Sequence, residues 1–342
     1  MSARAEIIPV FVPHLGCRHA CVFCNQRRIS GESCPATAQT VREAIRRAEG
    51  IPHTKKRELA FYGGSFTAIE ETRQCELLAA AKAALDQGKI EAIRLSTRPD
   101  AIDDRVLARL KAYGVETVEL GAQSMDDAVL LASKRGHTAG DVFRASELVK
   151  TAGFRLVLQM MTGLPGDTPG RCVETARRII KCKPDGVRIY PTVIVRDTEL
   201  YALWQAGAYR EHTVEDAVSV CARIVPLFER AGIPVIRLGL NPTDELSNGD
   251  AVAGAYHPAL GELVKSRILY NKAEALLQGV KPGMRVSIEV NPSQHSQMTG
   301  QHRQNLARLR EQFALSDVTV RPASLEKGEI RISAIENGDA LS

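Results

Sequence analysis

The chain has 342 residues, of which 44% are hydrophobic and 25% are charged. This composition excludes collagen-like, low-complexity and wholly disordered chains, and the length suits about two domains or one large α/β barrel with an appendage. With 45 Lys and Arg against 40 Asp and Glu, the formal net charge is +5 at pH 7, which permits an anionic partner such as RNA without requiring one.

No apolar run reaches the roughly 18 residues that a membrane-spanning helix needs, and Pro9 and Pro13 interrupt the N-terminal stretch where a signal peptide would be apolar. We therefore expect a cytoplasmic protein with no membrane partner. Eight cysteines are too few for a disulfide scaffold in a chain of this length. Three of them, Cys17, Cys21 and Cys24, lie close together, and clustered thiols in a reducing compartment suggest a metal site.

From Glu6 to about Leu240, short apolar runs alternate with amphipathic helical stretches, which is typical of βα units around a parallel sheet. Strands are expected at Ile7–Val12, Glu58–Tyr62, Ile93–Ser96, Thr117–Gly121, Arg155–Met160 and Gly186–Pro191. Helices are expected near Val41–Ala48, Thr72–Asp86, Arg105–Ala112, Asp141–Ala152 and Arg171–Lys181. The alternation predicts an α/β fold, a partial (β/α)6 TIM-type barrel whose working face is formed by the carboxyl ends of the strands.

The pattern changes after a further apolar run at Val235–Leu240. A polar loop at 241–254 and a helix near Gly261–Gln278 follow. The rest of the chain predicts a small α+β module with elements at Val286–Val290, Gln301–Phe313, Val318–Val320 and Glu329–Ile332. We therefore expect a barrel domain over residues 1–240 and a C-terminal α+β module over residues 241–342, which is a candidate for binding the substrate or RNA.

The most specific motif is the Cys-x3-Cys-x2-Cys spacing of residues 17–24. One loop with this spacing places three thiolates around a single [4Fe–4S] cluster and leaves the fourth iron open to an exogenous ligand. Zinc is the alternative, because a structural zinc site needs four ligands and His14 or His19 could supply the fourth. Buried, unreactive thiols are the least favoured explanation of three cysteines in so short a stretch.

These residues resemble the signature of the radical S-adenosylmethionine (radical SAM) superfamily, an aromatic residue within Cys-x3-Cys-x-x-Cys, matched by Cys17, Cys21, Phe23 and Cys24. The resemblance implies that the open iron holds the amino and carboxylate groups of S-adenosylmethionine (SAM). In that superfamily an electron from the cluster cleaves SAM, and the 5′-deoxyadenosyl radical abstracts a hydrogen atom. It also implies that Phe23 packs against the adenine and that a reduced ferredoxin or flavodoxin-type protein donates the electron.

A second motif, Gly63-Gly64-Ser65, follows the second expected strand. By itself it is a Gly-rich turn that tight strand-to-helix geometry would explain. At this place radical SAM proteins carry a Gly-Gly-Glu-like motif that receives the methionyl ammonium. The resemblance assigns that role to the Gly64 carbonyl and the Ser65 hydroxyl, although Ser65 replaces the acidic residue of the family pattern.

Further segments resemble the Elongator catalytic-subunit family, which modifies the wobble uridine of tRNA. They are Leu95–Asp100, Glu119–Ser124, Arg188–Thr192 and Asp197–Trp204. The likeness covers most of residues 7–210, makes Ser96 a candidate SAM contact and implies tRNA or another RNA as the substrate. That family also carries an acetyltransferase domain. No Gly-rich acetyl-coenzyme A loop is found in this sequence, so we do not expect acetyl transfer from it.

Three more candidates come from a resemblance to the oxygen-independent coproporphyrinogen oxidases, in which a Gln, an Arg and a polar residue on strand five hold SAM. Gln123, Arg135 and Gln159 occupy those places. A guanidinium binds a carboxylate with two hydrogen bonds, so Arg135 suits the methionyl carboxylate, while Gln123 and Gln159 suit ribose hydroxyls. Arg135 could instead be a solvated loop arginine, and Gln159 replaces an acidic residue of the family pattern.

Polar or aromatic residues at the expected barrel ends or in the following loop and helix are candidates for substrate contact, although each also has a structural explanation. They are His137, Tyr190, Arg237, Asn241, Tyr256, His257 and Arg267. Of Arg188 and Tyr190 on one strand, we expect only Tyr190 to face the barrel interior, because a long cation there needs a partner.

The C-terminal module contains a turn at Gly300 that opens a helix with Arg303, Arg308 and Arg310. The turn resembles the Gly-x-x-Gly loop of KH-type RNA modules loosely, since its second glycine would fall at Arg303. An ordinary polar helix start explains the same residues equally well.

The favoured interpretation is a radical SAM enzyme that modifies tRNA or another RNA. A radical SAM enzyme acting on a small molecule or tetrapyrrole is one alternative, and salt-dependent RNA binding would separate the two. A non-catalytic iron–sulfur or zinc protein is the other, which metal analysis with a SAM cleavage assay would separate.

Overall fold

The computed structural model describes residues 6–13, 15–17, 21–25, 35–53, 55–240 and 249–335. The chain divides into two compact units. The first comprises the described residues up to Val220 together with Ile224–Pro258, and the second comprises Cys221–Arg223 and the chain from Ala259. The boundary expected at residue 240 therefore lies after Pro258, because the strand β9 (Ala251–Gly254) pairs back onto β7 (Val193–Val195).

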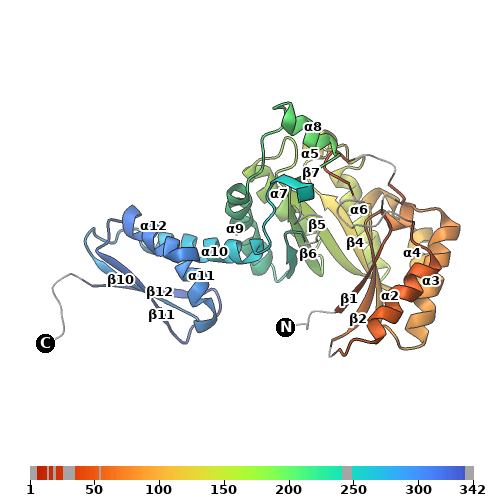
Figure 1. Cartoon of the computed structure of the whole chain (residues 1–342), viewed down its shortest axis with the longest axis horizontal. Helices are drawn as coiled ribbons and strands as arrows, with labels where there is room; N and C mark the ends of the chain where they lie inside the picture. The colour runs from red at the N-terminus through yellow and green to blue at the C-terminus, as the bar shows by residue number, and fades with distance from the viewer. Residues whose placement is uncertain are drawn as a thin grey trace. The chain divides into compact units, whose positions relative to one another are not determined.

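The first unit is built on a seven-stranded sheet of order β1-β2-β3-β4-β5-β6-β8 (Figure 1). Its strands are β1 (Glu6–Phe11), β2 (Arg57–Tyr62), β3 (Ala92–Thr97), β4 (Val115–Gln123), β5 (Arg155–Thr162), β6 (Gly186–Pro191) and β8 (Val235–Leu238). Every neighbouring pair is parallel. Since the described β1 and β8 do not pair with each other, the sheet is a partial barrel, which confirms the predicted fold class and adds a seventh strand to it.

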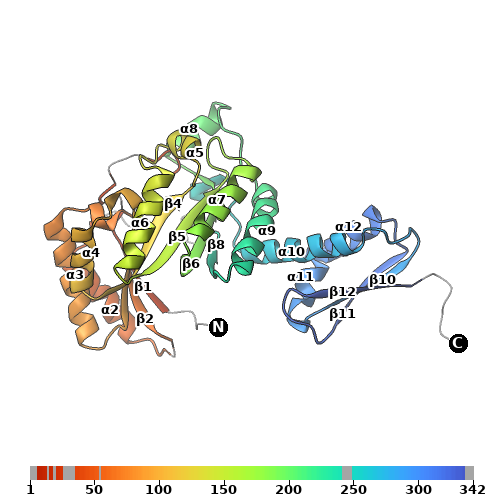
Figure 2. The ribbon, with the colours of Figure 1, turned by 180° about the vertical axis from the view of Figure 1, so that it is seen from behind.

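Helices connect the strands, and Figure 2 shows α6 and α7 lying over one face of the sheet. The helices of this unit are α2 (Ala38–Glu49), α3 (Glu71–Asp86), α4 (Asp104–Ala112), α5 (Asp127–Ala132), α6 (Ala139–Thr151), α7 (Pro169–Lys181), α8 (Glu199–Gln205) and α9 (Val214–Arg230). Thr37, Thr138 and Thr213 form capping boxes that begin α2, α6 and α9. Of the helices in the described ranges, none is both long and apolar enough to cross a membrane.

The second unit is a three-stranded sheet packed with three helices. The sheet has the order β11 (Asp317–Pro322), β10 (Arg285–Val290), β12 (Ile330–Ile335), with β10 parallel to β11 and antiparallel to β12. The helices are α10 (Leu260–Leu276), α11 (His295–Thr299) and α12 (Gln304–Gln312). Its own hydrophobic core includes Val286, Ile288, Leu306 and Leu309, so this unit is the expected α+β module.

Candidate active site

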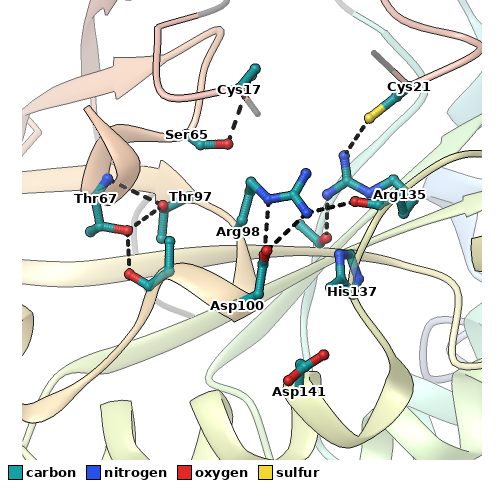
Figure 3. Close-up of polar contacts among 12 residues, drawn as sticks. Cys17, Cys21, Ser65, Thr67, Thr97, Arg98, Asp100, Arg135, His137 and Asp141 are labelled. Atoms are coloured by element: carbon teal, nitrogen blue, oxygen red, sulfur yellow. Dashed lines mark hydrogen bonds and ion pairs between the residues drawn. The ribbon is translucent and has the colours of Figure 1, made fainter. Parts of the chain in front are cut away.

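The described parts of the cysteine loop lie over the carboxyl ends of β2 and β4 (Figure 3). The Cys17 Sγ lies 3.8 Å from the Ser65 Oγ, and the Cys21 Sγ accepts a hydrogen bond of 3.2 Å from Arg135 Nη1. None of the cysteines in the described ranges forms a disulfide. Nor do the described residues contain three or more His, Cys, Asp or Glu side chains gathered as a metal site requires.

The turn after β2 is fitted to the cysteine loop by glycine. A Cβ at Gly64 would lie 2.4 Å from the Val12 carbonyl oxygen and 2.6 Å from that of Leu15. The backbone N–H of Ser65 donates to the same Leu15 oxygen at 2.9 Å, and Gly63 has φ 88°. Only glycine permits this approach of two backbones, so the motif holds the loop that carries Cys17.

Arg135 joins the loop to the strand ends from the other side. It is 8% exposed, and its Nη2 donates to the Gly121 carbonyl at 2.9 Å. Its own carbonyl accepts a bond of 2.6 Å from Arg98, whose Nε donates to Asp100 at 2.8 Å. This chain of contacts was not predicted from the sequence for Arg98 or Asp100, and Figure 3 shows it beneath Cys21.

Two buried polar atoms near Gly121 have no hydrogen-bond partner, namely Arg135 Nε and Gln123 Oε1. A Cβ at Gly121 would lie 2.8 Å from Gln123 Nε2 and 3.3 Å from Arg135 Nη2. Buried polar groups in native proteins are rarely left unpaired. A donor and an acceptor left unpaired beside the cysteine loop therefore fit a polar ligand such as SAM, and three nearby thiols of one loop fit an iron–sulfur cluster in donor type.

His137 is buried beside this site rather than presented to a substrate. Its Nε2 lies 3.2 Å from the Ala122 carbonyl oxygen, and its Nδ1 is without a partner. Burial and the charge of Arg135 lower the pKa of His137 from 6.5 to about 4. The imidazole is therefore neutral at pH 7 and adds no charge next to Arg135.

Below the strand ends, charged and polar side chains from five strands meet around Glu119. This inner polar cluster consists of Tyr62, Arg94, Glu119, Gln159 and Arg188. The carboxylate of Glu119 is 0% exposed and lies 2.9 Å from the Nε of Arg94 and 2.9 Å from the Nε of Arg188. Tyr62 Oη donates to it at 3.0 Å. Side chains from β2 and β6 can meet across a sheet only on its concave face, so the cluster fills the barrel interior.

Burial favours a raised pKa for Glu119, but the charges of Arg188 and Arg94 outweigh it and the pKa is lowered below its usual value. Glu119 is therefore an anion between two cations. The expectation that Arg188 points away from the interior is wrong. Residues i and i+2 of a strand share a face, and the partner that the cation needs is supplied by another strand.

Ser96 and Gln159 belong to the same interior. The Gln159 Nε2 donates to Ser96 Oγ at 3.3 Å and to Glu119 Oε2 at 3.0 Å. These contacts place both candidates between the inner polar cluster and the strand ends. The sequence signal that could have indicated the cluster is the recurrence of charged residues two apart on strands otherwise made of Val, Ile and Leu.

The remaining candidates lie apart from the site or outside the described residues. Phe23 packs against the apolar cluster of Ile194 and Leu200, and Tyr256 packs against that of Val193 and Val195. Arg237 pairs in register with Arg188 on β6, while Arg267 stacks on Tyr270 within the second unit at 5.9 Å. Asn241, His14 and His19 lie outside the described residues.

Two family profiles match the chain: the radical SAM superfamily over residues 11–179 and the radical SAM C-terminal domain over residues 184–269. The chain is 36% identical over 138 residues to Elongator complex protein 3 of Homo sapiens, which is 40% of this chain and 25% of that protein. It is 29% identical over 204 residues to the tRNA uridine(34) acetyltransferase of Methanocaldococcus infernus, which is 52% of this chain and 38% of that protein. The matches thus span well under half the length of these relatives.

The solved structure of archaeal Methanocaldococcus infernus Elp3 with an N-terminal deletion is similar in fold, with a TM-score of 0.63 and 23% identity over 86% of this chain and 68% of that chain. Together the two profiles extend over most of the first unit and into the second. They confirm the enzyme class and its cofactors, a [4Fe–4S] cluster and SAM, that the cysteine spacing predicted. The chain belongs to the radical SAM superfamily and is related to the Elongator catalytic-subunit family.

Proposed function

We propose that this radical SAM enzyme modifies tRNA or another RNA. The observation that carries the proposal is the sequence relationship to proteins named tRNA uridine(34) acetyltransferase, which extends over 52% of this chain. The radical SAM profile occupies residues 11–179, so the relationship supports radical chemistry on RNA. Acetyl transfer is not part of the proposal.

We assign the cluster ligands to Cys17, Cys21 and Cys24. The thiols are the only residues of the loop with the soft donor atoms that iron–sulfur clusters take. The cluster and SAM, when bound, supply radical abstraction of a hydrogen atom. A site built on thiolates needs a reducing compartment, so we place the enzyme in the cytoplasm, with a reduced ferredoxin or flavodoxin-type protein as electron donor.

For SAM we assign the carboxylate to Arg135, whose buried Nε is unpartnered. Gln123, whose buried Oε1 is also unpartnered, is assigned to a ribose hydroxyl. The amide nitrogen of Gln159 already donates to Ser96 and Glu119, which leaves its oxygen as the acceptor for a hydroxyl. The ammonium is assigned to the turn at Gly63-Gly64-Ser65, and the adenine to Phe23.

The test is anaerobic reconstitution with iron and sulfide, followed by an assay of 5′-deoxyadenosine with dithionite as reductant. Parallel reactions contain bulk tRNA lacking modifications, coproporphyrinogen or no substrate. We expect tRNA to increase 5′-deoxyadenosine formation and to yield a nucleoside of changed mass on digestion. Stimulation by the tetrapyrrole with none by tRNA would contradict the proposal and favour a small-molecule substrate.

A further inference from the structure

The second unit contains a turn between α11 and α12 that the barrel chemistry does not use. The turn comprises residues 300–303, and three of them have positive φ: Gly300 at 75°, His302 at 49° and Arg303 at 62°. A left-handed backbone costs about 1–2 kcal/mol at a residue that has a side chain. Such a conformation persists where the surrounding contacts fix it.

Asn305 provides those contacts. Its buried amide nitrogen donates to Ser266 Oγ at 2.9 Å, to the Met298 carbonyl at 3.1 Å and to that of Gln297 at 3.3 Å. A Cβ at Gly300 would lie 2.8 Å from Asn305 Cγ, so glycine is required for this packing. The turn is therefore ordered before any ligand binds, while the side chains of residues 301–303 are exposed.

The surface of this unit is basic. Residues 259–335 contain eleven Lys and Arg against seven Asp and Glu, which is most of the net charge of the chain. Some of these charges are neutralised, as Lys265 is by Glu262 at 2.7 Å. Three exposed arginines of the turn and of α12 have no carboxylate partner within the described part of the chain: Arg303, Arg308 and Arg310.

The arginines of α12 lie on different flanks. Gln312 accepts a bond of 2.7 Å from Tyr270 of α10, and the charge of Arg308 also acts on Tyr270, so Arg308 lies on the flank facing α10. Two residues correspond to about 200° of helical rotation, which places Arg310 on the flank away from α10. Arg310 and the exposed turn thus form a surface separate from Arg308.

We propose that the turn at residues 300–303, together with Arg310, binds the phosphate backbone of single-stranded RNA. The inference rests on the proposed function, because an RNA substrate supplies the ligand. KH modules clamp RNA backbone with a glycine-containing loop of this kind. Here an ordered turn leads into the amino end of the nine-residue α12, whose N–H groups attract phosphate, and guanidinium groups bind phosphate bidentately. The second unit then recruits the polynucleotide on which the barrel acts.

The experiment measures tRNA affinity of the full chain at several salt concentrations. In one variant, Gln301→Asp with His302→Asp, two carboxylates repel phosphate, and Asp tolerates the left-handed backbone at position 302. We expect its Kd for tRNA to rise at least tenfold. A second variant, Arg303→Ala with Arg310→Ala, removes two cations from exposed positions. Its slope of log affinity against log salt should decrease by about two, or one for each lost phosphate contact.

Matched controls test the same changes elsewhere in the unit. Asn271→Asp with Gln278→Glu adds two carboxylates at exposed positions toward the far end of α10, and Arg308→Ala removes a cation from the other flank of α12. Both should bind tRNA within twofold of wild type. All variants should retain 5′-deoxyadenosine formation in the absence of RNA, because the barrel is unchanged.

The outcomes separate the two proposals. If wild type binds tRNA in a salt-dependent way and both test variants bind as tightly, the site proposed here is wrong and the RNA substrate stands. If wild type shows no salt-dependent affinity for tRNA, the proposed function is wrong. Should the aspartate variant lose RNA-free SAM cleavage as well, its fold is disturbed and the arginine variant decides.

Discussion

The guanidinium of Arg135 donates a hydrogen bond from Nη1 to the Sγ of Cys21 at 3.2 Å. The same group donates to the Gly121 carbonyl from Nη2 and keeps its buried Nε unpartnered. One arginine therefore contacts a proposed cluster ligand and also presents a donor to the space next to it. Hydrogen bonds to sulfur ligands are among the factors that set the reduction potential of iron–sulfur clusters.

Replacing Arg135 by Ala should act on SAM and on the cluster separately. Loss of a charge-assisted bond of about 1.5–3 kcal/mol lowers SAM affinity tenfold to over a hundredfold. The variant should still hold iron, with a more negative cluster potential because a cation and a donor to sulfur are lost. Isothermal titration with SAM and potentiometry followed by electron paramagnetic resonance measure the two effects. Arg144→Ala, an exposed position on α6, is the control, and SAM affinity equal to wild type in Arg135→Ala would count against the assignment.

The inner polar cluster should be essential for stability through Glu119. Replacing it by Ala leaves Arg94 and Arg188 buried without their shared partner, and breaking a buried ion pair costs about 3–5 kcal/mol. Glu116 lies on the same strand and pairs with Lys56 at 2.6 Å at the surface, so Glu116→Ala should cost no more than about 1 kcal/mol. Urea unfolding of both variants measures the difference. Equal losses would show that the cluster contributes no more than a surface pair.

Gly64→Ala should reduce iron binding. The added Cβ would lie within 2.6 Å of two carbonyl oxygens, so the cysteine loop has to move away from the turn after β2. Gly50 has no atom within 4 Å of its built Cβ and φ of −74°, which makes Gly50→Ala the matched control. Iron and sulfide content after reconstitution measures the effect, and full occupancy in Gly64→Ala would argue against the role of this close approach.

His137 should make the first unit less stable in acid. Its folded-state pKa of about 4 lies below the ordinary 6.5, so the unfolded chain binds a proton more readily. The stability associated with the neutral form is complete above pH 6.5 and is lost as pH falls from 6.5 toward 4. At pH 5 the loss amounts to about 2 kcal/mol.

The variant His137→Gln stays neutral and lacks this dependence. The difference in unfolding free energy between wild type and variant should therefore shift by that amount between pH 7.5 and pH 5. Unfolding curves at the two pH values measure it, and a difference that does not change with pH would place the true pKa of His137 near its ordinary value.

Local patterns were sufficient for most of the barrel. The alternation of apolar runs and amphipathic stretches predicted the parallel strands, and the spacing of Cys17, Cys21 and Cys24 predicted the superfamily. The helices α8 and α9 were not predicted, and α9 carries Pro226 in its interior, which disfavours a helix in local pattern analysis. The helix expected from Gln301 begins at Gln304 because His302 and Arg303 have positive φ.

Contacts between distant strands could not be predicted in this way. Arg135 and Cys21 are 114 residues apart, and Arg188 and Glu119 are 69 residues apart. Only the curvature of the sheet brings the second pair together on the concave face. The wrong orientation of Arg188 followed from treating it without this partner.

The measurement that tests the central claim most directly is 5′-deoxyadenosine formation by single-cysteine variants of the reconstituted enzyme. Cys17→Ala, Cys21→Ala and Cys24→Ala should each lose the iron–sulfur cluster and cleave no SAM with dithionite. Cys75→Ala, which removes a thiol of α3 outside the motif, should match wild type in both. Wild-type levels of cluster and 5′-deoxyadenosine in any one of the three motif variants would contradict the account.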